Sequence, residues 1–365
     1  MAEKKKKPLW LKLIIIVLVI AIVGVAAFAG LSIMVYEQFF GIRYETSEQY
    51  KYYISDFDGL MCADYEFTSD KGQKLAGYLY HNGEGSPLGI IVFAHGFGGG
   101  GHNSYMDVIS YFAKNGYYVF AYDATGNDNS EGKAVGGMPQ GVIDLEAAID
   151  FVKLQKEFYH LPIMLLGHSW GGYSVTNVLK YHPDVKAVAS FCGFDKSSDL
   201  LYAQGKMMAG EAIDYVMPFM NAYEKLKFGE YAENTALGAF ENTDAKIMAF
   251  HSTDDTTVPI EYGFDIWHEK YKDDPRFTFV KFEDKGHSGI FYSEEGSEYI
   301  KGFREAGKEW AEDLSYDYKA EENAERYKED LTKYIKENLD REKWASLYDT
   351  ELLGSVLEFY NSARG

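Results

Sequence analysis

Short apolar runs alternate with segments of helical spacing through the middle of the chain. The strand-like runs are almost wholly apolar: LGIIVFAHG, YYVFAYDATG, LPIMLLG, VKAVASFCG, AKIMAFHS and RFTFVKFED. The helical segments between them include YMDVISYFAKNG, GVIDLEAAIDFVKLQ and YSVTNVLKYH. Ahead of all of these, YEFTSD and KLAGYLYH have the pattern of a hairpin. Buried strands separated by helices predict an α/β fold, with a mainly parallel sheet covered by helices on both faces.

A different pattern occupies residues 13–36, LIIIVLVIAIVGVAAFAGLSIMVY, which contain no charged side chain. At about 1.5 Å per residue, a helix of this length can cross a hydrocarbon core of about 30 Å. Five lysines crowd residues 1–12, whereas the positions just beyond the apolar run carry little positive charge. The bias predicts a single-pass anchor at the cell membrane with residues 1–12 in the cytoplasm and the body outside. The alternative is a secreted protein whose signal peptide is cleaved after Ala27-Phe28-Ala29.

The remaining chain divides by composition. Residues 37–60 are polar and aromatic without a clear period, which favours a linker, and residues 61–315 contain the alternating strands and helices. About fifty residues that the sheet does not need, 195–243, predict a helical cap. Its methionines form either an adaptable apolar surface or ordinary packing against the core. The first helix after residue 294 is expected to pack on the sheet. Residues 316–365 form a charged helical extension, which either stays solvated or packs back through its apolar end.

Charge and cysteine content exclude several classes of protein. The net charge of −20 falls almost entirely on the body of the chain, which argues against nucleic-acid binding. The only two cysteines, Cys62 and Cys192, provide neither a disulfide framework nor zinc-type spacing, although a single bridge between them stays open. We expect neither a metal nor another cofactor, because no ligand spacing relates the histidines His102, His160, His182, His251 and His268.

The hexapeptide GHSWGG, residues 167–172, lies where the apolar run LPIMLLG changes into a helical segment. A serine in G-x-S-x-G on such a turn is held in a strained conformation that lifts its hydroxyl above the sheet, and larger side chains at the glycine positions would collide. Ser169 is therefore the candidate nucleophile. The amide of Trp170, at the start of the new helix, points toward any negative charge that forms there.

A serine hydroxyl needs a general base, and the base needs an orienting acid. Both follow at strand ends: Asp254 and Asp255 in AFHSTDDTTVP, and His287 in VKFEDKGHSG. Loops at the carboxyl ends of neighbouring parallel strands meet at one edge of the sheet. We therefore expect an aspartate of this pair and His287 to lie near Ser169.

These motifs resemble the α/β-hydrolase family, in particular its lysophospholipase-like and serine-aminopeptidase-like branch, over residues 61–315. HGFGGG at 95–100 resembles the family's His-Gly turn, and YDATGNDNSEG at 122–132 and DTTVP at 255–259 resemble two further segments. The resemblance implies Ser169 as nucleophile, His287 as general base and Asp255 as the acid.

It also implies an oxyanion hole made by the backbone amides of Phe97 and Trp170. Some members of the family carry the acid after the preceding strand, where Asp195 and Asp199 lie, so these two remain alternatives to Asp255.

The favoured function is a membrane-anchored serine hydrolase that cleaves a small carboxylic ester or other acyl substrate through an acyl-enzyme. Alternatives are a serine peptidase or acyltransferase with the same triad, and an inactive fold that serves as a binding module. Nothing in the sequence names a protein partner.

Overall fold

A computed structural model of the chain describes residues 8–83 and 85–364. The basic segment expected at residues 1–12 lies mostly outside these residues, including all four lysines at 4–7. The core is an eight-stranded sheet in the order β1-β2-β4-β3-β5-β6-β7-β8. Its strands are β1 (Met61–Thr68), β2 (Lys74–His81), β3 (Ile90–Ala94), β4 (Tyr118–Tyr122), β5 (Ile163–His168), β6 (Ala187–Phe191), β7 (Lys246–Ser252) and β8 (Phe277–Phe282).

The hairpin of β1 and β2 is antiparallel and joins β4 antiparallel, whereas β4, β3, β5, β6, β7 and β8 are parallel. The helices are α1 (Leu9–Phe40), α2 (Met106–Lys114), α3 (Pro139–Leu154), α4 (Trp170–Asn177), α5 (Ser197–Ala209), α6 (Ile213–Phe228), α7 (Ala236–Phe240), α8 (Phe264–Tyr271), α9 (Glu294–Glu312), α10 (Ala324–Asn338), α11 (Arg341–Trp344) and α12 (Thr350–Ala363). The expected α/β architecture is confirmed.

Both faces of the sheet are buried because successive side chains of each strand point to opposite sides. Leu165 of β5 belongs to the apolar cluster that α3, α4 and α8 cover, whereas Met164 and Leu166 belong to the cluster under α2 and α12. This arrangement explains why the parallel strands read as continuous apolar runs rather than as alternating ones. It also leaves the carboxyl edge of the parallel strands free for a site.

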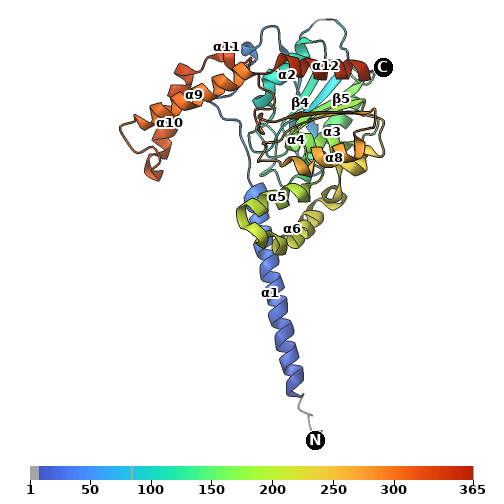
Figure 1. The fold of residues 1–365 in the computed structure, drawn as a ribbon, viewed down its shortest axis with the longest axis vertical. Coiled ribbons are helices and arrows are strands. Elements are labelled where there is room, and N and C mark those ends of the chain that lie inside the picture. The colour runs from blue at the N-terminus through green and yellow to red at the C-terminus, as the bar shows by residue number, and fades with distance from the viewer. Residues whose placement is uncertain (1–7, 84, 365) are drawn as a thin grey trace.

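The cap follows β6. Helices α5, α6 and α7 lie between β6 and β7 in the chain and gather at the end of the molecule from which α1 projects (Figure 1). Of the methionines in the cap, Met217 and Met220 are buried in the core, while Met207 and Met208 are exposed. Two of these methionines therefore pack in the core and two lie on the surface of the cap.

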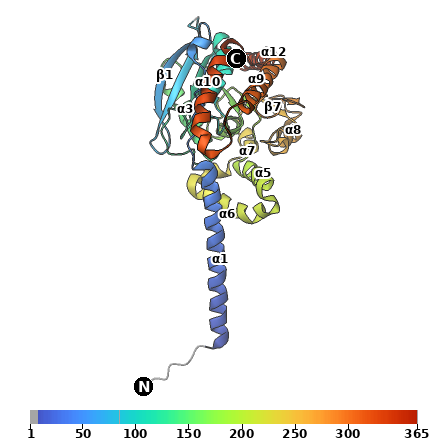
Figure 2. The same ribbon diagram turned by 90° about the vertical axis from the view of Figure 1, so that its left-hand side faces the viewer.

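Helix α1 is the one described helix that is long and apolar enough to cross a membrane. Its first part, to Phe28, is almost entirely exposed. Toward its end Ser32, Tyr36 and Phe40 are buried, and these three positions lie on one face of the helix, which packs against α6. Figures 1 and 2 show α1 leaving the body beside the cap.

The C-terminal region differs from the expectation in one respect. Helices α9 and α10 stand away from the sheet (Figure 1). Their aromatic side chains stack on one another, with the rings of Trp310 and Tyr334 4.5 Å apart. The place expected for the first of these helices is taken by α12, whose Leu353, Val356 and Tyr360 are fully buried. The apolar end of the chain thus packs back on the sheet.

The two thiols do not pair. Cys62 is exposed and Cys192 is buried, and both are free.

Candidate active site

Ser169 lies at a sharp turn between β5 and α4, with backbone angles φ 57° and ψ −114°. A non-glycine residue in this region is strained, and such strain persists only where surrounding contacts enforce it. The turn is enforced by close packing on both sides of the serine. A Cβ atom on Gly167 would come within 2.3 Å of the carbonyl oxygen of Gly171, and one on Gly171 within 1.9 Å of that of Ala94. Ser169 itself is 9% exposed.

The structure brings His287 and Asp255 together. The Nδ1 atom of His287 lies 2.7 Å from Oδ2 of Asp255, whose side chain is buried. Because a carboxylate only accepts hydrogen bonds, Nδ1 carries a proton in this contact, and in the neutral imidazole Nε2 is then the nitrogen with the lone pair. Burial alone would raise the pKa of Asp255, but hydrogen bonds from His251 and His287 outweigh it and hold that pKa well below its usual value. Asp255 therefore stays ionised beside the imidazole.

We call the turn at Ser169, residues 167–171, the elbow. His168, the residue before Ser169, bonds this elbow to the loop that carries His287. Nε2 of His168 donates to the backbone carbonyl of His287 at 3.0 Å, and the two rings lie 4.8 Å apart. On its other side, Nδ1 of His168 accepts from the hydroxyl of Tyr105 at 2.9 Å. Burial and the nearby His287 lower the pKa of His168 to about 3. The ring therefore stays neutral and links the Tyr105 hydroxyl to the His287 carbonyl. The loop of His287 is thus bonded to the residue that immediately precedes Ser169. Within the described residues, the serine hydroxyl itself makes no hydrogen bond.

The His-Gly loop, residues 95–101, carries Phe97 and follows β3. The amide of Gly96 donates to the hydroxyl of Tyr105 at 3.1 Å, and the amide of Gly101 donates to Oδ2 of Asp128 at 2.8 Å. Among the described residues, no acceptor takes the amide of Phe97 or that of Trp170. These two amides are thus able to donate hydrogen bonds to a ligand at the edge of the sheet where the elbow lies.

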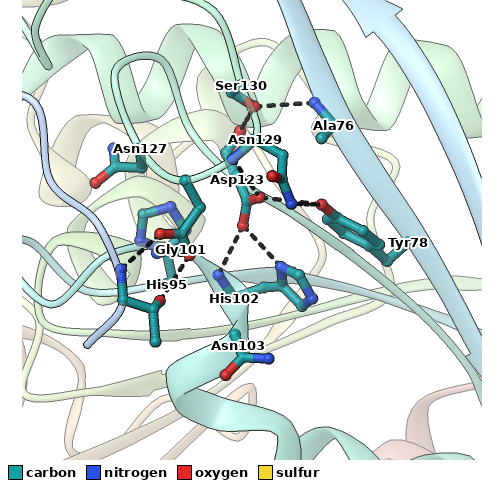
Figure 3. A network of polar contacts seen from close by, with 12 residues as sticks. Ala76, Tyr78, His95, Gly101, His102, Asn103, Asp123, Asn127, Asn129 and Ser130 are labelled. Carbon is teal, nitrogen blue, oxygen red and sulfur yellow. Dashed lines mark hydrogen bonds and ion pairs between the residues drawn. The ribbon is translucent and has the colours of Figure 1, made fainter. Parts of the chain in front are cut away.

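A buried polar network supports the end of that loop (Figure 3). Asp123, at the end of β4, accepts from the amide of His102 at 3.0 Å and from its ring Nδ1 at 2.7 Å, and the hydroxyl of Tyr78 lies 3.2 Å away. His95 bonds the carbonyl of Gly96 through Nδ1 and accepts from the amide of Ala124 through Nε2. These hydrogen bonds give Asp123 and His95 a structural role.

Comparison with known proteins reveals similar sequences and a similar fold. The sequence profile of the family described as serine aminopeptidase, S33, matches residues 85–256. The monoglyceride lipase of Mus musculus is 30% identical over 150 residues, and that of Rattus norvegicus is 29% identical over 148 residues. These matches cover 39% and 38% of this chain and 46% of each lipase, so the chain spans about half the length of the curated relatives it matches. An esterase of Pyrococcus furiosus superposes with a TM-score of 0.52 over 81% of this chain and 98% of that one, at 17% identity.

The chain has the α/β-hydrolase fold. The structural neighbour supports the fold alone, whereas the family profile and the lipases favour the lysophospholipase- and aminopeptidase-like branch.

Three other carboxylates considered from the sequence lie elsewhere in this α/β-hydrolase fold. Asp254 accepts from the hydroxyl of Ser252 and from the amide of Gly286. Asp195 accepts from the amide of Leu237 and the indole of Trp267, and Asp199 pairs with Lys196. Of these candidates, the described contacts bring only Asp255 to His287.

Sequence reasoning missed a second histidine at the acid. Nε2 of His251 lies 3.3 Å from Oδ2 of Asp255 and 2.8 Å from the carbonyl of Val258. His251 stands four residues before Asp255 on β7, so its spacing from the acid loop was the available signal. The amides of Thr257 and Val258 also donate to Asp255, each at 2.9 Å.

Potential metal ligands occur only around the same residues in the described part of the chain. The ligand atoms of His168, Cys192 and His287 lie within 4.8 Å of one another, as do those of Cys192, His251 and Asp255. Both ring nitrogens of His168 are already hydrogen-bonded, and Asp255 is held by two imidazoles. Hydrogen bonds among these groups account for their closeness.

Proposed function

We propose that this protein is a serine hydrolase that cleaves carboxylic esters. The observation that carries the proposal is the pairing of His287 with Asp255 on a loop bonded to the residue before the strained Ser169. The names of its relatives, monoglyceride lipases and an esterase, favour an ester over other acyl substrates.

In the proposed reaction Ser169 Oγ attacks the ester carbonyl carbon while Nε2 of His287 takes the hydroxyl proton. The carbonyl oxygen becomes an oxyanion that the amides of Phe97 and Trp170 stabilise. Collapse of this intermediate breaks the ester C–O bond, and the alcohol leaves with the proton from His287. Water then gives a proton to His287 and attacks the acyl-enzyme, so the acid is released and Ser169 regains its proton.

Asp255 keeps His287 in the tautomer that this sequence of steps needs and offsets the positive charge that the imidazole acquires. His251 and two amides keep the carboxylate in place. Asp255 does not itself take a proton, which agrees with its lowered pKa.

We also propose that α1 anchors the protein in a membrane, with the hydrolase body on the outer side. The exposed apolar surface of α1 from Leu9 to Phe28 and the lysines that precede it in the sequence support this topology. Residues 61–315, with the cap, and the segment that ends in α12 form the proposed hydrolase body.

The test uses the full chain in detergent or lipid nanodiscs. Hydrolysis of p-nitrophenyl esters and labelling by a fluorophosphonate are measured for the wild type, for Ser169→Ala and for Ser346→Ala, a substitution at an exposed serine far along the chain. We expect both signals to vanish only in Ser169→Ala. Labelling without ester turnover would favour a peptidase or transferase, and folded wild type without either signal would favour a binding module.

A further inference from the structure

The segment that joins α1 to the body contacts the proposed oxyanion loop directly. Phe97 is partly buried, and its ring has three aromatic neighbours: Phe40 at 5.6 Å, Tyr44 at 5.0 Å and Trp170 at 5.9 Å between centroids. Trp170 belongs to the elbow. The other two belong to the end of α1 and the residues just after it, which we call the junction (residues 36–46).

The junction is bonded along its length to the loop that follows β4. The amide of Gly136 donates to the carbonyl of Phe40 at 2.8 Å, and that of Val135 donates to the carbonyl of Ile42 at 3.1 Å. Tyr44 exchanges backbone hydrogen bonds with Gly126 and Asp128, at 3.0 and 3.1 Å. These bonds resemble the ladder between neighbouring strands, so the junction is a fixed part of the body rather than the linker expected from its composition.

The junction also closes on the far end of the His-Gly loop. Asp128 accepts from the amide and hydroxyl of Thr46, both at 2.6 Å, and from the amide of Gly101 at 2.8 Å. Gly100 lies so close to Thr46 that a Cβ atom there would come within 2.2 Å of the Thr46 nitrogen. Its φ of 86° also favours glycine. Phe97 is thus held between two contacts with the junction, one at its ring and one three residues further on.

Cap helix α6 fixes the other side of the junction. The hydroxyl of Tyr36 donates to the buried carboxyl of Glu224 at 2.8 Å, and the hydroxyl of Ser197 donates to the same oxygen at 2.9 Å. Glu37 accepts from Tyr223 and Lys227, both at 2.7 Å. These bonds tie α1 to the cap within about one helical turn of Phe40.

From these contacts we infer that two residues of the junction, Phe40 and Tyr44, are positioning residues of the active site, and that their rings hold the amide of Phe97 where the oxyanion forms. The inference rests on the proposed function of Phe97. Phe40 acts through Phe97 and touches no reacting atom. Loss of its ring lets the loop move, and a shift of about 1 Å at a transition-state contact costs on the order of 100-fold in rate.

The chain contains a matched pair for the test. Phe40 is 2% exposed and faces Phe97, whereas the neighbouring Phe39 is 37% exposed. In the full chain in nanodiscs, we expect Phe40→Ala to lower kcat for a p-nitrophenyl ester about 100-fold with KM changed less than about threefold, and to slow fluorophosphonate labelling in parallel. Phe39→Ala should match the wild type. Rates are compared at a temperature at which thermal unfolding shows both variants folded.

Tyr44→Leu is the second variant, because Tyr44 is only partly buried and its loss removes the ring contact at smaller cost to folding. It decides the question if Phe40→Ala does not fold, and we expect its kcat to fall at least tenfold. An unchanged kcat in the folded variants, or a rise in KM alone, would overturn the positioning role. A wild type without any Ser169-dependent activity would instead refute the proposed function, so the two failures are distinguishable.

Discussion

Substitution of Gly171 by alanine tests whether the elbow geometry controls the reaction. The added Cβ would lie 1.9 Å from the carbonyl oxygen of Ala94, whereas an ordinary contact begins near 3.4 Å. Backbone must therefore move by about 1.5 Å, and the atoms that can move are those of α4 and the elbow on one side and of β3 on the other. Both Ser169 and the amide of Trp170 lie on the moving side. A displacement of this size predicts a loss of kcat of at least about 100-fold and a destabilisation of about 1–3 kcal/mol or more.

The assay compares Gly171→Ala with Gly302→Ala, whose Cβ on α9 would meet nothing within 4 Å. Esterase activity and thermal unfolding are measured for the full-length proteins in the same detergent. The control should keep wild-type kcat and be equally or slightly more stable, because alanine favours a helix more than glycine does. Wild-type kcat in folded Gly171→Ala would refute the reasoning, since it would mean that the elbow tolerates the shift.

Three further predictions concern the acid, the cap and the C-terminal helix. Asp255→Asn should lower kcat about 10⁴-fold and Asp254→Asn far less, as measured by ester hydrolysis; equal losses would contradict the assignment. Burial raises the pKa of Glu224 to about 7 against the lowering effect of its hydrogen bonds, so the folded state holds a proton that the unfolded state has lost above about pH 4.5. The thermal midpoint of the wild type should therefore fall as pH rises from 5 to 8, and that of Glu224→Gln should fall less. Equal pH dependence of the two midpoints would contradict a buried, protonated Glu224. Leu353→Ala should cost about 2–5 kcal/mol in urea unfolding and Leu226→Ala, at an 84% exposed residue, less than about 0.5 kcal/mol; equal costs would mean that α12 is not part of the core.

The elements that sequence could predict are those whose cause is local. The proposed nucleophile, Ser169, is marked by glycines two positions away on either side, and the strand that precedes it is marked by an unbroken apolar run. The loops of Asp255 and His287 follow strands that are just as easily recognised. Parallel topology then brings three strand ends to one edge, which is why residues 86 and 118 positions from Ser169 could be placed there from the sequence.

The features that sequence could not predict depend on contacts between distant segments. The hydroxyl of Tyr360 donates to the carbonyl of Leu165 across 195 positions, and nothing near α12 indicates that it, rather than α9, covers the sheet. The junction has the same origin. Its backbone bonds run to residues 126–136. Beyond the end of α1, residues 41–46 show no period because they form neither a helix nor a strand with one exposed face.

The length of α1 that remains free of the cap determines how high the protein stands above a bilayer. Residues 13–31 measure about 28 Å as a helix, close to the thickness of the hydrocarbon core, and Ser32 is already buried against the body. With α1 anchored as proposed, the cap rests at the level of the lipid head groups with no spacer between them. An ester dissolved in the same membrane then meets the enzyme by lateral diffusion in two dimensions. Turnover of such an ester would follow its mole fraction in the lipid rather than its total concentration in the sample.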